Sequence, residues 1–239
     1  VMRTISLNGI LTSLASNYNR RNKNVRLYEL GNIYIPKCLP VVDYPDERMQ
    51  FTLGMYGEGD FYTMKGVVEE FFDKIGLHEK EVYDPKAGKP FLHPGRQANI
   101  IYGGETVGYL GEVHPAVADT YGIGERAYVA VLDMPSIEPF ATFDRKYEGI
   151  AKYPAVNRDI SMVIPKDVLA GQIEEVIENK GGSYLESYQL FDVYEGTQIK
   201  KGYKSMAYSI VFRAKDKTLE EADVASAMKR ILKGLEALD

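Results

Sequence analysis

Residues 203–213 constrain the fold most strongly, because large apolar side chains alternate there with small or polar ones. One side carries Met206, Tyr208, Ile210 and Phe212, and the other carries Tyr203, Ser205, Ala207, Ser209 and Val211. A period of two is typical of a half-buried β-strand, since successive side chains point to opposite faces of a sheet. The stretch therefore predicts a strand with one face on a hydrophobic core.

The segments before this strand predict its partners. A strand over 159–164 ends at Pro165, and residues 185–194 form a second strand that a polar turn, 196–202, joins to the strand at 203. Between them, Gly181-Gly182 ends a helix. The apolar face of that helix consists of Leu169, Ile173, Val176 and Ile177.

A last helix follows the alternating strand. Thr218-Leu219-Glu220-Glu221 matches a capping box, which marks a helix start. The apolar positions that follow at helical spacing are Val224, Met228, Ile231, Leu232, Leu235 and Leu238. The order strand, helix, strand, strand, helix is one strand short of the ferredoxin-like β-α-β-β-α-β motif. We expect the missing strand to follow Asp239 in a longer protein.

The first part of the chain predicts a mostly antiparallel sheet with two or three helices. Apolar residues at helical spacing over 7–15 indicate a helix, and Thr63 caps a second one that Gly76 ends. Strands are expected at 25–30, 33–35, 50–56, 98–102, 106–110 and 128–132. Gly31 and Asn32 are expected to interrupt the first of them, and Gly103-Gly104 to join a hairpin.

The fold class is therefore α+β, and the polar, mostly charged segment 144–148 divides the chain into two domains, 1–144 and 145–239. No apolar run approaches the roughly 18 residues of a membrane span, which excludes an integral membrane protein. One cysteine excludes an internal disulfide framework, and three histidines leave little material for a metal centre. The net charge of −5 argues against RNA binding through bulk charge but allows a local RNA site.

Seven strings, in order and over nearly the whole chain, resemble the β subunit of bacterial phenylalanyl-tRNA synthetases. They are Asn24–Gly31, Phe91–Ala98, Gly108–Pro115, Tyr153–Asp159, Leu190–Gly196, Gly202–Ser205 and Arg213–Val224. That subunit is much longer than 239 residues, so the resemblance places this chain in its C-terminal part. It implies a class II synthetase-like domain without activity at 1–144, and a ferredoxin-fold anticodon-binding domain at 145–239.

The resemblance also implies a function. The parent enzyme attaches phenylalanine to its tRNA using ATP and Mg²⁺, as a cytoplasmic α2β2 assembly. This chain would be its tRNA-binding and scaffold fragment, with no cofactor of its own. Its first domain would pack against the catalytic α subunit through an apolar patch, for which we expect Ile10, Leu14, Phe91 and Leu92 to be exposed.

Catalysis by the fragment itself is not expected. The strand 25–34 looks like the class II strand that precedes an Arg-x-Glu, but Ile35-Pro36-Lys37 follows it instead. Adenylate formation needs a fixed cation on the α-phosphate, where negative charge accumulates. The alternative is an active ligase with Arg26 and Arg126 as the cations. The string 122–126 superficially resembles the arginine-bearing third class II motif, although a turn accounts for its glycines.

The candidate RNA site lies in the second domain. Asp192 and Tyr194 are two residues apart on one predicted strand and share a face. By resemblance, Tyr194 stacks on an anticodon base, Asp192 and Ser205 make polar contacts to it, and Lys204 and Arg158 contact the RNA backbone. Spacing alone leaves two alternatives open. Tyr194 would merely cover a core, or the open sheet face would dock a protein without binding RNA.

The sequence does not assign a binding partner to three further residues. His93 and His114 each precede a proline, and we expect them to order their loops rather than bind metal. Arg96 suits an interface ion pair or a tRNA phosphate, and the sequence does not decide between them.

Overall fold

A computed structural model describes residues 2–145, 147 and 149–238 of the chain. The chain divides into two compact units, Val1–Lys146 and Tyr147–Asp239, whereas the sequence interpretation placed the division between residues 144 and 145. We describe each unit by itself. None of the helices within the described ranges is long and apolar enough to cross a membrane.

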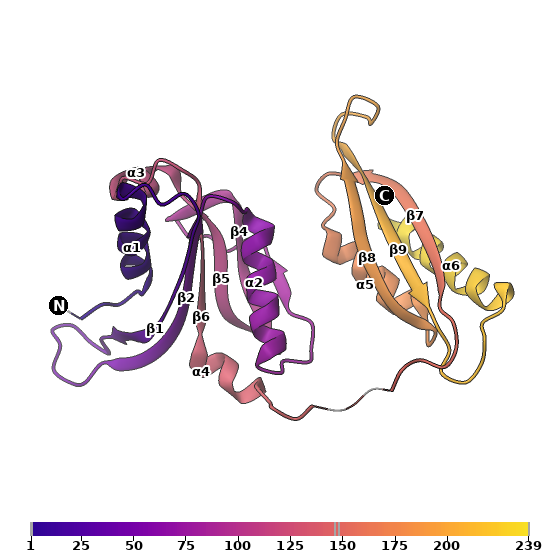
Figure 1. Cartoon of the computed structure of the whole chain (residues 1–239), viewed down its shortest axis with the longest axis horizontal. Helices are drawn as coiled ribbons and strands as arrows, with labels where there is room; N and C mark the ends of the chain where they lie inside the picture. The colour runs from indigo at the N-terminus through magenta and orange to yellow at the C-terminus, as the bar shows by residue number, and fades with distance from the viewer. Residues whose placement is uncertain (1, 146, 148, 239) are drawn as a thin grey trace. The chain divides into compact units, whose positions relative to one another are not determined.

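The first unit is built on a six-stranded antiparallel sheet with the order β1-β2-β6-β5-β4-β3 (Figure 1). Its strands are β1 (Val25–Ile35), β2 (Asp46–Tyr56), β3 (Val82–Asp84), β4 (Leu92–Tyr102), β5 (Glu105–Val113) and β6 (Ala127–Asp133). Its helices are α1 (Leu7–Asn19), α2 (Phe61–Lys74), α3 (Pro115–Tyr121) and α4 (Met134–Ile137), followed by the 3-10 turn η1 (Glu138–Phe140).

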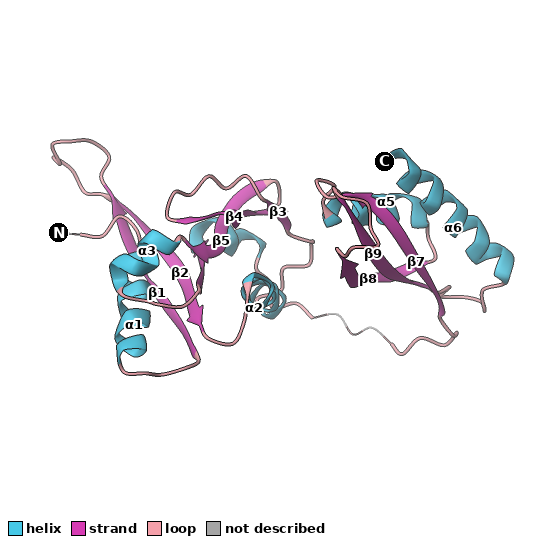
Figure 2. Ribbon diagram, turned by 90° about the horizontal axis from the view of Figure 1, so that it is seen from above, coloured by secondary structure: helices cyan, strands magenta, loops and turns pink. Residues whose placement is uncertain are grey.

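Two hydrophobic clusters cover the two faces of this sheet. Helices α1 and α3 pack on one face and α2 on the other (Figures 1 and 2). Strand β6 lies in the middle and is apolar on both sides: Val129 and Val131 face the α1 cluster, whereas Tyr128, Ala130 and Leu132 face the α2 cluster. A strand covered on both faces needs no polar side, which explains why its sequence does not alternate.

Two details differ from the sequence expectations. Gly31 and Asn32 do not interrupt β1, because each pairs in register with a residue of β2. Helix α2 begins at Phe61, with Asp60 rather than Thr63 as its N-cap. The Asp60 carboxylate accepts from the Thr63 backbone N–H at 2.8 Å, and the Thr63 hydroxyl accepts from the Asp60 N–H at 3.2 Å. These reciprocal bonds form a capping box and place Thr63 in the first turn.

The second unit has the expected order of strands and helices. Its elements are β7 (Val156–Pro165), α5 (Ala170–Gly181), β8 (Leu185–Tyr194), β9 (Tyr203–Phe212), α6 (Glu221–Leu235) and η2 (Glu236–Leu238). The three strands pair antiparallel in the order β7-β9-β8, as in the first three strands of a ferredoxin-like sheet. Both helices cover one face (Figure 1), and their apolar sides join Met206, Tyr208, Ile210 and Phe212 in one core.

Helix α6 begins two residues later than a Thr218 cap would require. Its N-cap is Glu220, whose backbone N–H donates to the Asp223 carboxylate at 3.2 Å. The Lys217 ammonium donates to the same carboxylate at 2.7 Å. The carboxylate of Asp223, in the first turn of the helix, therefore accepts the hydrogen bond of the N-cap backbone N–H.

Candidate nucleic-acid interface

The face of the second sheet away from α5 and α6 is open and consists mainly of small and polar side chains. Residues paired across neighbouring strands lie on the same face, so the register assigns its members. They are Asn157, Asp159, Ser161 and Val163 on β7; Ser187 and Gln189 on β8; and Tyr203, Ser205, Ala207, Ser209 and Val211 on β9. Within residues 149–238 no helix packs on this face.

A β-bulge in β8 decides which side chains join this face at its end. Leu190 pairs with Tyr208, and Asp192 pairs with the next residue of β9, Ala207, so Phe191 is an extra residue. Leu190 packs against the core. Strict alternation would turn Asp192 to the same side as Leu190, but the extra residue turns it to the open face.

Tyr194 reaches the open face in the same way, where it pairs with Ser205. Its side chain is 43% exposed, and its ring lies so close to Gly196 that a Cβ atom there would overlap it. The hydroxyl of Ser205 lies 3.4 Å from that of Ser161 on the neighbouring strand β7. An exposed aromatic ring is thus held beside a carboxylate, that of Asp192, and a pair of hydroxyl groups.

The structure does not bring Lys204 and Arg158 to this face. Lys204 pairs with a buried residue of β7, and its ammonium donates to the carbonyl oxygens of Lys166 and Val168 at 3.2 and 2.7 Å. Arg158 pairs with core residue Ile210, and its guanidinium contacts Glu221 at the start of α6 at 2.6 Å. Both cations lie on the side of the helices, so three of the five predicted site residues gather and two do not.

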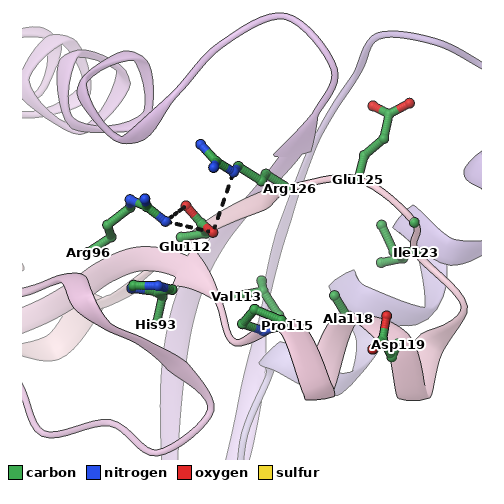
Figure 3. A pocket seen from close by; sticks show the side chains of 11 residues that line it. His93, Arg96, Glu112, Val113, Pro115, Ala118, Asp119, Ile123, Glu125 and Arg126 are labelled. Atoms are coloured by element: carbon green, nitrogen blue, oxygen red, sulfur yellow. Dashed lines mark hydrogen bonds and ion pairs between the residues drawn. The ribbon is translucent and has the colours of Figure 1, made fainter.

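The first unit contains a hollow of about 450 Å³ that two of the resembling strings line (Figure 3). Glu112 is buried there, and one guanidinium nitrogen of Arg96 donates to both of its carboxylate oxygens, at 3.0 and 3.2 Å. Arg126 approaches the same carboxylate at 3.9 Å. Arg96 therefore makes an ion pair within its own domain, because a buried carboxylate has to be paired.

The two histidines order their loops, as expected. His93 Nδ1 accepts from the Gly95 backbone N–H at 3.1 Å, and His114 Nδ1 accepts from the Ala116 N–H at 3.2 Å at the N-cap of α3. Among the residues that the structure describes, no group of three His, Cys, Asp or Glu side chains could hold a metal ion.

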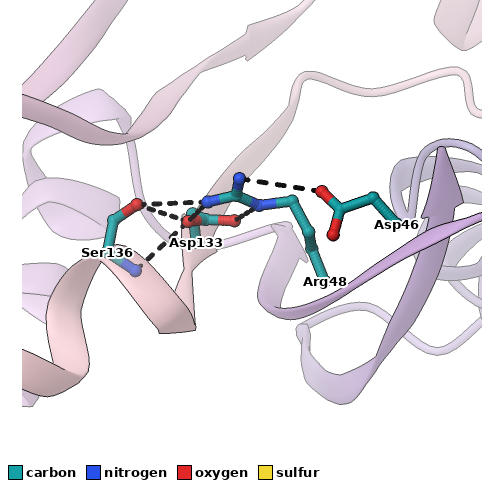
Figure 4. A network of polar contacts seen from close by, with 4 residues as sticks. All are labelled: Asp46, Arg48, Asp133 and Ser136. Atoms are coloured by element: carbon teal, nitrogen blue, oxygen red, sulfur yellow. Dashed lines mark hydrogen bonds and ion pairs between the residues drawn. The ribbon is translucent and has the colours of Figure 1, made fainter. Parts of the chain in front are cut away.

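Arg48 of β2 is bound to Asp133 at the end of β6 (Figure 4). Its Nε donates to Asp133 Oδ1 at 3.0 Å, and Asp46 lies 4.0 Å away. The hydrogen bond and charge of Asp133 raise the pKa of Arg48. Burial alone would raise the pKa of Asp133, but hydrogen bonds from Arg48 and Ser136 outweigh it and lower that pKa. Arg48 therefore ties β2 to the start of α4.

The two arginines of the active-ligase alternative have different contacts. Arg126 is beside the buried Glu112, whereas Arg26 is an exposed residue of the edge strand β1, opposite Met55. Between these two described residues the structure shows no hydrogen bond or ion pair.

The apolar patch is not where the sequence led us to expect it. Ile10, Leu14 and Leu92 are buried in the α1 cluster, and Phe91 packs against that cluster with its ring tilted against that of Tyr109. The apolar side of α1, which we expected to be exposed, is covered by the sheet of the same unit.

An apolar patch lies instead on the β1–β2 hairpin, beside Phe71 of α2. Tyr28 and Leu30 are 74% and 56% exposed, and Met49 is exposed beside them. Phe51 and Phe71 underlie it: the Tyr28 and Phe51 ring centroids are 5.8 Å apart, and those of Phe51 and Phe71 are 4.7 Å apart. We call these five residues the hairpin patch. Contiguous exposed apolar surface of this kind is typical of protein interfaces.

Comparison with known families agrees with both units. Residues 1–134 match the family model described as "Phenylalanyl tRNA synthetase beta chain CLM domain", and residues 151–238 match "Ferredoxin-fold anticodon binding domain". This chain belongs to the phenylalanyl-tRNA synthetase β-chain family. The recognition from the sequence and the α+β fold with a ferredoxin-like domain are thereby confirmed.

Curated relatives of this β-chain family member include three phenylalanine–tRNA ligase β subunits. The chain is 41% identical over 236 residues to the phenylalanine–tRNA ligase β subunits of Clostridium tetani and of Clostridium acetobutylicum, and 36% identical over 244 residues to that of Moorella thermoacetica. Each match covers 99% of this chain. The chain spans about 30% of the length of these relatives.

Proposed function

We propose that the second unit binds the anticodon of phenylalanine tRNA, and that the first unit is a non-catalytic scaffold that packs against an α subunit. The parent assembly is then an α2β2 ligase that attaches phenylalanine to tRNA. The proposal of RNA binding rests on one observation. Asp192, Tyr194 and Ser205 lie together on a sheet face that is not covered by a helix within residues 149–238. The matching family model, named for anticodon binding, supports it.

The chemistry of this face suits an unpaired base. A ring such as Tyr194 offers a stacking platform worth about 1–3 kcal/mol per base. The Asp192 carboxylate only accepts hydrogen bonds, so it selects a base edge that carries N–H donors. The Ser205 hydroxyl both donates and accepts, which lets it complete the contact to the same base.

ATP and Mg²⁺ are the cofactors of the proposed parent reaction. Among the described residues no group of three His, Cys, Asp or Glu side chains could hold a metal ion, and the candidate Arg126 lies 3.9 Å from the Glu112 carboxylate. We assign ATP and Mg²⁺ to the catalytic α subunit, and we propose that this chain alone forms no aminoacyl-adenylate.

Titration of the whole chain with the anticodon stem-loop of phenylalanine tRNA tests the RNA part. We expect binding that weakens as salt rises, since phosphate contacts release counterions. A stem-loop with the same stem and substituted anticodon bases should bind more weakly, because base contacts specify and phosphate contacts only position. No binding of either RNA would favour the protein-docking alternative, whereas equal affinity for both RNAs would refute base reading by this face.

A charge in the hairpin patch tests the scaffold part. Leu30→Glu is expected to weaken association with the α subunit about tenfold or more, because an interface would then bury an unpaired carboxylate. Val82→Glu is the matched control, since Val82 is 58% exposed on β3 at the opposite edge of the same sheet. Co-purification at several concentrations measures the effect. Equal losses in both variants, or no loss in Leu30→Glu, would remove the hairpin patch from the interface.

A further inference from the structure

The open face needs a cation that the sequence interpretation did not identify. Asp159 and Asp192 both lie on it, and their charges repel RNA phosphate. Glu195 follows Tyr194 directly, but its charge is compensated by an ion pair with Lys166. Lys204, the expected phosphate contact, gives hydrogen bonds to two carbonyl oxygens on the side of the helices.

Lys200 supplies such a cation. It is exposed in the turn between β8 and β9, and its ammonium nitrogen lies 5.1 Å from the ring centroid of Tyr203. Tyr203 pairs with Pro165 and is two residues from Ser205, so its half-buried ring belongs to the open face. Attraction between an ammonium and an aromatic ring is worth about 0.5–1 kcal/mol at an exposed site. That attraction holds the Lys200 charge on the side of the sheet that carries Tyr194.

We propose that Lys200, held by the ring of Tyr203, contacts the backbone phosphate of the nucleotide whose base stacks on Tyr194. The inference rests on the proposed RNA function and names the residue that positions the strand. Tyr194 pairs with Ser205, so the ring platform and the lysine lie at the same end of the sheet. A lysine ammonium is a compact charge with three donors, and it interacts with phosphate without reading the base.

The salt dependence of RNA binding distinguishes a phosphate contact by Lys200 from a purely structural role of this residue. With the whole chain and the phenylalanine anticodon stem-loop, Lys200→Met should lower the slope of log affinity against log salt by about 0.7, the value for one single-strand phosphate contact. Between 50 and 200 mM salt, the wild-type affinity should then fall about 2.6-fold more than that of the variant. Tyr203→Leu should lower the slope partly, whereas Tyr203→Phe should keep it, because the ring and not its hydroxyl holds the lysine.

The neighbouring Lys201 gives the matched control. It is exposed in the same turn and carries the same charge, so Lys201→Met should leave the slope within error of the wild type. An unchanged slope in Lys200→Met, or an equal change in Lys201→Met, would overturn the assignment. Absence of binding by the wild-type chain would instead refute the proposed RNA function, so the two failures are distinguishable.

Discussion

Tyr194→Ala is expected to weaken binding of the anticodon stem-loop by about 1–3 kcal/mol, or roughly 5- to 150-fold in Kd. The variant removes the exposed ring and with it the stacking surface, while the backbone of β8 keeps its pairing with β9. Tyr194→Phe should cost much less, because stacking needs the ring more than the hydroxyl. Fluorescence titration at fixed salt measures both.

Three further variants test whether the effect is specific to the Tyr194 ring and its neighbours. Leu232→Ala truncates a side chain of similar exposure on α6, on the opposite side of the unit, and should leave the affinity unchanged. Gly196→Ala should reproduce part of the loss, because its new Cβ displaces the Tyr194 ring. Asp192→Ala should reduce discrimination at one base rather than weaken all RNAs equally. Unchanged affinity for Tyr194→Ala with an intact thermal melt would favour protein docking on this face.

Gly76→Ala is expected to destabilise the first unit by about 2–4 kcal/mol. Gly76 has φ +79°, which a residue with a Cβ adopts only with strain. A Cβ there would also overlap the carbonyl oxygen of Thr142. That backbone cannot simply move away, because the Thr142 N–H donates to the Ile75 carbonyl at 3.0 Å. Urea denaturation followed by circular dichroism measures the loss.

Gly88→Ala separates the two causes of this loss. Gly88 also has a positive φ, +62°, but no atom lies within 4 Å of the position its Cβ would take. Its substitution should therefore cost only the conformational strain, about 1 kcal/mol. If Gly76→Ala cost no more than Gly88→Ala, the close packing of the α2 end against the segment at Thr142 would be wrong.

Local periodicity was enough to predict most elements. The alternation at 203–212 and the helical spacing over 7–15 identify β9 and α1, and the predicted bounds of β8 agree with the structure. The same alternation predicts the side of Lys204: if Ser205 lies on the open face, its neighbour Lys204 lies on the other. The helix side of Lys204 was therefore predictable from the sequence.

Other features depend on residues far apart in the sequence. Phe191 is an ordinary strand residue, and only the pairing of β8 with β9 makes it the extra residue of a bulge. The exposure of Ile10 was mispredicted because a helix stripe reveals that it will be buried, but not against which surface.

The sequence by itself determined most of the elements, their order and the family, because side-chain period and short motifs are local properties of the chain. The tertiary structure alone decided that Asp192 and Tyr194 share the open face with Ser205, and that Lys200 rests on the ring of Tyr203. The physical reason is that pairing with the neighbouring strand sets which face of the sheet a side chain occupies. One extra residue in the strand reverses that face.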